Sequence, residues 1–273
     1  MNRYLKLVNF EIGRFFKLYL ILIIITIISQ ITGVIIISNQ YVNRANDFIY
    51  RQGMSIEQFI TEDGLMSMLQ VTLSLWFMGP IAICIVALIF YTFFIWYRDW
   101  FAKNTFIYRL FMLPTARLNV YLAKATSIFL MVFGLIALQL LLIPLLSTIL
   151  KWIVPREFRL DMTVNEIIDS FPYLQVLLPQ SFMEFMIHYG IGFMVVFIVF
   201  TAILFERSFR WKGILLGAVY GVLAISLFVW PFFTLIDYLY PVELVVTETI
   251  LGLIVTGISI WVSHYLLTKK ITV

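Results

Sequence analysis

Charged residues are scarce in this chain of 273 residues: only 12% are Asp, Glu, Lys or Arg, whereas 62% are hydrophobic. About a quarter of the residues of an average soluble domain are charged. The shortage excludes an ordinary water-soluble protein and indicates an integral membrane protein. The single cysteine, Cys84, lies in an apolar run and excludes both an internal disulfide and a metal site built on paired thiolates. We expect Cys84 to be a small packing residue.

The sequence also lacks the residue groups that chemistry inside a membrane requires. It contains no Gly-x-x-x-x-Gly-Lys-Ser/Thr phosphate loop, and no soluble stretch is long enough for a nucleotide-binding domain. Pumps and intramembrane proteases need ionisable residues within their spans, and no such constellation occurs here. Glu184 and His188 lie one helical turn apart, but further ligands at fixed spacing are missing, which favours interfacial polar residues over a metal site. We expect no enzymatic activity, bound metal or cofactor in this chain.

Long uncharged runs are abundant. Six runs each supply the roughly 20 apolar residues that a helix needs to cross about 30 Å of hydrocarbon, and the second supplies them from about Leu75. The runs are 18–43, 64–97, 125–150, 185–205, 213–236 and 249–268. They predict an all-α membrane protein with six transmembrane helices, in which residues 1–273 form a single domain.

The distribution of charge predicts the orientation. Fourteen of the 19 Lys and Arg residues lie in segments 1–17, 98–124, 206–212 and 269–270, whereas twelve of the 15 acidic residues lie in the alternate loops. Because cytoplasmic loops carry an excess of Lys and Arg, both termini should lie in the cytoplasm, with the chain in the cell membrane. The basic pI then reflects topology and contact with anionic lipid; we expect no nucleic-acid partner.

Three further patterns predict local structure. Residues 1–17 alternate apolar and basic positions at helical spacing, which is typical of an amphipathic elbow helix lying in the membrane interface. Ser55 with Gln58 and Thr163 with Glu166 match the capping-box spacing, so short helices should follow and end near Gly64 and Pro172. The third pattern is a glycine at every fourth position of the fifth run, which permits close helix packing, either within the chain or in a dimer; the residues are Gly213, Gly217 and Gly221.

The loop 98–124 gives the clearest indication of function in the sequence. Phe106, Leu110 and Leu113 can form an apolar patch, Tyr108 and Arg109 can bond across an interface, and Pro114 can stop a short helix. An ordinary basic loop with aromatic anchors would explain its composition without any partner.

The order of residues in this loop favours a more specific hypothesis. Thr105, Leu113-Pro114, Arg117 and Lys124 resemble the first cytoplasmic loop of type-2 ABC exporter permeases, in which a Thr begins a short helix, Pro-x-x-Arg ends it and a Lys opens the next span. Asp99 stands for an acid that the family often has, and Asn104 stands where Gly is common.

The resemblance implies that 99–117 couples this chain to a separate cytoplasmic ATPase subunit that binds ATP and Mg²⁺, with Lys124 anchoring the next span at the interface. It also implies a second permease chain, the same or homologous. The alternatives are a non-enzymatic membrane anchor or immunity protein and, third, a membrane enzyme.

Overall fold

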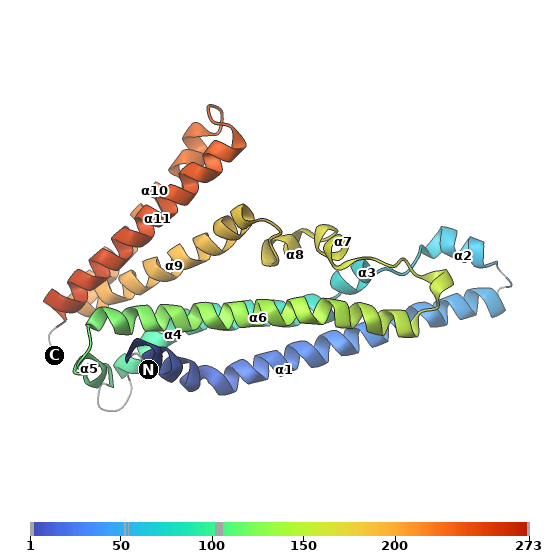
Figure 1. The fold of residues 1–273 in the computed structure, drawn as a ribbon, viewed down its shortest axis with the longest axis horizontal. Helices are drawn as coiled ribbons and strands as arrows, with labels where there is room; N and C mark the ends of the chain where they lie inside the picture. Colours follow the sequence, from blue (N-terminus) through green and yellow to red (C-terminus); the bar gives the residue numbers. More distant parts are fainter. Residues whose placement is uncertain (1–2, 52, 54, 102–105, 272–273) are drawn as a thin grey trace. The chain divides into compact units, whose positions relative to one another are not determined.

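The computed structural model describes residues 3–51, 53, 55–101 and 106–271. Within these ranges the helices are, in chain order, α1 (Arg3–Asn46), η1 (Asp47–Arg51), α2 (Ile56–Asp63), α3 (Met68–Thr72), α4 (Leu75–Phe101), α5 (Phe106–Phe111), α6 (Arg117–Ile153), η2 (Arg156–Phe158), α7 (Val164–Asp169), α8 (Pro172–Leu177), α9 (Phe182–Phe209), α10 (Trp211–Leu235), α11 (Pro241–Tyr265) and η3 (Leu266–Lys270) (Figure 1).

Among the described residues, six helical stretches are long and apolar enough to cross a membrane, which confirms the predicted number. They are Arg3–Arg51, Leu75–Phe101, Arg117–Ile153, Phe182–Phe209, Trp211–Leu235 and Val242–Lys270. The second begins at Leu75, as the sequence predicts, and it contains Pro80, whose missing backbone N–H removes one helical hydrogen bond. Among the described residues β-pairing is limited to one isolated parallel bridge, between Met66 and Arg159.

The contacts divide the chain into two compact units. One comprises Met1–Phe15, Leu88–Met131 and Pro179–Val273, and the other comprises Phe16–Ala87 and Val132–Leu178. The division falls within three long helices, α1, α4 and α6, each of which contributes residues to both units. The single domain of residues 1–273 stays a prediction from the sequence.

The unit formed by Phe16–Ala87 and Val132–Leu178 has a core built from its long helices and its short loop helices. Val34, Phe77 and Ile143 are fully buried in this core. Gln30 and Gln139 exchange two amide hydrogen bonds of 3.1 and 3.2 Å between α1 and α6, and Gln30 Nε2 also donates to Phe77 O at 3.3 Å. These bonds satisfy polar groups that would be costly to bury unpaired.

Both predicted capping boxes are present in this unit. Gln58 N donates to Ser55 Oγ and Ser55 N to Gln58 Oε1, which starts α2. Thr163 and Glu166 make the corresponding bonds at the start of α7. α2 ends at Asp63, immediately before Gly64, and α7 ends at Asp169, three residues before Pro172 begins α8.

In the other unit, α9, α10 and α11 pack against one another. Trp96 of α4, Tyr121 of α6 and Phe200 of α9 are fully buried, and the rings of Trp96 and Tyr121 meet Phe200 edge-on at 5.5 and 5.7 Å. Thr201 of α9 pairs with the Ser263 hydroxyl of α11 at 2.9 Å. Aromatic packing and satisfied hydroxyls therefore join α4, α6, α9 and α11.

The expected elbow differs in one respect from the structure. Residues 3–17 are not a separate helix, because α1 continues without a break from Arg3 to Asn46. The segment buries Leu7, Val8, Glu11 and Phe15, while two other apolar residues of the segment, Leu5 and Phe16, are about half exposed. Glu11 lies on the buried face because its carboxylate has cationic partners there.

Candidate functional site

The loop between α4 and α6 contains one short helix. α4 ends at Phe101, α5 covers Phe106–Phe111, and α6 begins at Arg117. Thr105 and Asn104 lie outside the described residues. The chain leaves the helical conformation before Pro114, as expected, because proline disfavours helical geometry in the residue that precedes it.

α5 presents two different faces. Ile107, Leu110 and Phe111 are buried. Leu110, which the sequence predicts for an apolar patch with Phe106 and Leu113, therefore packs against its own chain. Arg109 is exposed and Tyr108 is half-buried, with its ring edge-on to Trp100 at 6.0 Å. Leu113, in the turn after α5, is 43% exposed.

Phe106, Leu110 and Leu113 nevertheless line one groove with the first turns of α1. Arg3, Lys6, Leu7 and Phe10 form the opposite wall, and the guanidinium of Arg3 donates to the carbonyl oxygen of Pro114. The start of the chain therefore packs directly on the α5 loop.

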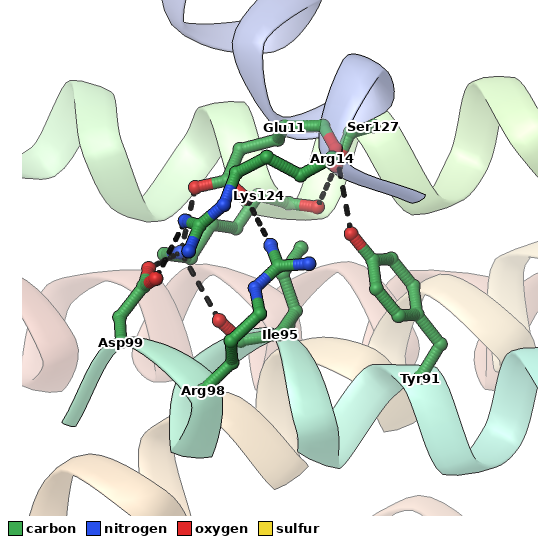
Figure 2. A network of polar contacts seen from close by, with 8 residues as sticks. All are labelled: Glu11, Arg14, Tyr91, Ile95, Arg98, Asp99, Lys124 and Ser127. Carbon is green, nitrogen blue, oxygen red and sulfur yellow. Dashed lines mark hydrogen bonds and ion pairs between the residues drawn. The ribbon is translucent and has the colours of Figure 1, made fainter. Parts of the chain in front are cut away.

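A buried ion cluster lies next to this loop; we define it as Glu11 and Arg14 of α1, Arg98 and Asp99 of α4, and Lys124 of α6. Lys124 and Asp99 are fully buried. The Lys124 ammonium pairs with Glu11 Oε1 at 2.7 Å and with Asp99 Oδ2, and it donates to Ile95 O at 3.2 Å (Figure 2). Lys124 therefore uses its three donors on two carboxylates and a backbone carbonyl.

Two arginines complete the cluster. Arg14 Nη1 pairs with Asp99 Oδ1 at 2.6 Å, and Arg98 Nη2 pairs with Glu11 Oε2 at 3.1 Å. The Arg14 guanidinium also lies 5.1 Å from the ring centroids of both Phe10 and Phe106, which connects the cluster to the start of α5.

The cluster has three cations and two anions. Ion pairs in a low-dielectric environment are costly to form, but removal of one partner is strongly destabilising because it leaves a buried charge uncompensated. The arrangement fixes α1, α4 and α6 to one another beside α5.

The structure places two of the predicted coupling residues in this cluster. Lys124 is the eighth residue of α6, which starts at Arg117, and is fully buried. Asp99 is a buried counter-ion within α4. Their roles in coupling stay predictions.

Arg117 also has a role that the sequence did not reveal. Its Nη1 donates to Leu267 O at 2.6 Å and to Ile271 O at 2.7 Å, at the carboxyl end of the last helix. A cation there is favourable because the terminal carbonyl groups of a helix lack intrahelical partners.

Glu11, Arg14 and Arg98 were not predicted to be site residues. A signal was present, because the segments predicted to be cytoplasmic contain only three acidic residues, Glu11, Asp99 and Glu206. Each has an internal partner: the first two lie in the cluster, and Glu206 accepts a hydrogen bond from the Tyr97 hydroxyl. The few acids of a basic segment are the ones expected to pair internally.

The glycine positions of α10 face α9. A Cβ atom on Gly213 would lie 2.8 Å from Glu206 Cα, and one on Gly217 would lie 2.9 Å from Ala202 O. At Gly221 the nearest atom is a methyl group of Ile198 at 3.9 Å, so this position is not tightly packed. Gly213 and Gly217 thus permit close packing within the chain.

Among the described residues no group of three or more His, Cys, Asp or Glu side chains is placed to hold a metal ion. Glu184 lies in the first turn of α9, where its Oε2 accepts from Gln180 N at 3.1 Å and its backbone N–H donates to the Ser181 cap. This helix-capping geometry explains Glu184 without a ligand.

Comparison with known protein families, curated protein sequences and solved structures gave no match to this chain.

Proposed function

We propose that this chain is the membrane-spanning permease subunit of an ATP-driven exporter of the type-2 ABC superfamily. A separate cytoplasmic ATPase subunit binds ATP and Mg²⁺, and two permease chains provide the translocation path between them. Two observations support this proposal: the order in which Thr105, Leu113-Pro114, Arg117 and Lys124 follow one another in the sequence, and the six apolar helices. In this arrangement the chain lies in the cell membrane with both termini in the cytoplasm, as the charge distribution predicts.

The observation that carries the proposal is the attachment of α5 to the ion cluster. α5 lies between α4 and α6, and Asp99 and Lys124 pair these two helices while fully buried. Arg14 extends the connection to α1 and stacks on Phe106, the first residue of α5. A force applied to α5 would be passed to three membrane helices together, because breaking the buried pairs is costly.

The exposed face of the loop suits a protein contact. Arg109 is exposed, and Met112 and Leu113, which follow α5, are 71% and 43% exposed. Arg and Met are enriched in protein interfaces. In the proposed assembly this surface meets the ATPase, while the buried face of α5 keeps it attached to its own chain.

Two variants test this role. Arg109→Glu reverses an exposed charge, and Leu110→Pro breaks α5; neither changes an apolar run that directs membrane insertion. We expect both to lose nucleotide-dependent movement of the spans while the six helices stay inserted. Arg156→Glu is the matched control, because Arg156 is exposed in a loop predicted to lie outside.

The measurement is ATP turnover of the copurified complex in lipid vesicles, together with the nucleotide-dependent labelling rate of a single cysteine at position 243, on a background in which Cys84 is replaced. If Arg109→Glu and Leu110→Pro respond to nucleotide as fully as Arg156→Glu does, the proposed role of the loop is wrong.

A further inference from the structure

A second cleft lies in the membrane-spanning part of the chain, between α9, α10 and α11. It is lined by residues within 185–197 of α9, by Phe228 of α10 and by residues within 248–256 of α11. Figure 1 shows α9 separating from α10 and α11 toward the amino-terminal end of α9. By the predicted orientation this is the outer half of the membrane.

The lining is almost entirely apolar. Phe185, Phe193 and Phe197 contribute from α9, and Phe228 contributes from α10. The hydroxyls of Thr249 and Thr256, which also line the cleft, donate to carbonyl groups of their own helix, at 2.8 Å each. A ligand would therefore find apolar surface over most of this cleft.

One carboxylate interrupts the apolar lining. Glu248 of α11 lies at the cleft, and no Lys or Arg occurs in residues 160–206 or 213–268, which include all three lining segments. All other Asp, Glu, Lys or Arg residues of these two ranges are also acidic; they are Asp161, Glu166, Asp169, Glu184, Glu206, Asp237 and Glu243. The sequence places Glu248 in the loop before the run 249–268, but the structure includes it in the apolar helical stretch Val242–Lys270. A carboxylate within a membrane span is costly unless a cation or a hydrogen-bond donor meets it.

We infer that this cleft binds a cationic amphiphile, whose protonated amine pairs with Glu248 and whose apolar chain or ring packs against the phenylalanines. Its volume of about 190 Å³ is smaller than the roughly 300–1,000 Å³ of sites that enclose a whole drug-sized ligand. The cleft therefore holds one apolar chain or ring, and the rest of the molecule stays in lipid. The identification of this ligand as the exported substrate rests on the proposed function. The binding of the ligand to the isolated chain does not depend on that function.

Glycines in α9 provide a test of the cleft and a matched control. A Cβ atom on either Gly190 or Gly192 would have no neighbouring atom within 4 Å, so both positions accept a larger side chain without a clash. Gly190 lines the cleft, whereas Gly192 is exposed on another face of α9. Gly190→Leu fills the cleft, and Gly192→Leu adds the same side chain outside it.

The experiment uses the chain alone, without an ATPase, in nanodiscs of zwitterionic lipid. The probe is a diazirine-bearing long-chain alkylamine, and the comparison probe is the uncharged alcohol of the same length; labelled sites are mapped by mass spectrometry. We expect amine labelling on the segments of α9 and α11 that line the cleft. Labelling should fall about tenfold in Glu248→Gln, which loses a charge-assisted hydrogen bond, and similarly in Gly190→Leu.

Gly192→Leu and Asp237→Asn, which changes an exposed acid in the turn before α11, should keep wild-type labelling. The inference is overturned if the amine and the alcohol label the same sites equally, because the cleft then takes ordinary lipid chains only. It is also overturned if Glu248→Gln labels like wild type. Either result leaves the proposed ATPase partnership untouched, because no ATPase is present in the measurement.

Discussion

The burial of Asp99 and Lys124 is determined by their ionic partners. Both lie in a segment whose basic charge predicts a cytoplasmic location, yet both are fully buried in the ion cluster. With Arg14, Arg98 and Glu11 the cluster carries one more cation than anion, so its two carboxylates are the scarce component.

This imbalance predicts an order of mutational effects. Asp99→Asn leaves three cations with one carboxylate and should cost about 3–5 kcal/mol, typical of breaking a buried pair. Lys124→Met leaves two balanced pairs and should cost less. The double variant should cost less than the sum of the two single variants, because it removes both members of one pair.

Thermal unfolding in detergent measures these effects through Cys84, which is buried and becomes reactive toward a thiol dye on unfolding. Asp161→Asn is the control, because the Asp161 side chain is 47% exposed and exposed pairs contribute only about 0–1 kcal/mol. A Lys124→Met variant less stable than Asp99→Asn would contradict the charge balance described for the cluster.

The capping box of α7 makes a pH prediction at the residue scale. Hydrogen bonds that the Glu166 carboxylate accepts from the backbone N–H and from the side-chain hydroxyl of Thr163 hold the pKa of Glu166 below its usual value. A lowered folded pKa means that the cap stabilises α7 above the unfolded pKa of glutamate and is lost as the pH falls through the lower folded value. We expect the Thr163 amide resonance to titrate below the usual glutamate range.

Glu166→Gln is the control for this titration, because it keeps an oxygen acceptor without an ionisable group. A Thr163 amide titration at or above the usual glutamate pKa, or an unchanged titration in Glu166→Gln, would show that this bond does not control the cap.

At the scale of elements, local signals in the sequence were sufficient for many features. The uncharged runs predicted the six long helices, and the Ser55 and Thr163 boxes predicted the starts of α2 and α7. The continuity of α1 and the burial of Lys124 were not predictable from the same signals. The burial of Lys124 involves its contact with Glu11, 113 residues away, and Glu11 also pairs with Arg98, 87 residues away; sequence spacing carries no information on such pairs.

The packing of α10 on α9 predicts that substitutions on two faces of α10 differ in their effect on stability. Gly217→Leu should destabilise the chain by about 1–3 kcal/mol, as overpacking does, because a side chain there would collide with Ala202. Val222→Leu on the same helix should have little effect, since Val222 is 65% exposed. The measurement is thermal stability and monodispersity in detergent.

Equal behaviour of the two variants would refute this packing argument. Loss of a dimer from a monomer that stays folded in Gly217→Leu would assign the glycine face to a contact between subunits instead.

At the scale of the whole molecule, the charge distribution predicts which end of each helix is cytoplasmic. Arg109 and Lys212 should face the cytoplasm, and Asp161 and Glu243 should face outside. Single cysteines at these positions, on a background in which Cys84 is replaced, are tested with a membrane-impermeant thiol reagent in intact cells. Labelling is expected at 161 and 243; labelling at 109 but not at 161 would invert the topology.

The central claim is that this chain works with a separate ATPase, and the most direct measurement is the nucleotide-binding protein that copurifies with the tagged chain from native membranes in mild detergent. We expect one ATPase polypeptide per wild-type chain, less in Arg109→Glu and the wild-type amount in Arg156→Glu. If the wild-type chain retains no nucleotide-binding partner in mild detergent or in native membrane extracts, the claim is contradicted.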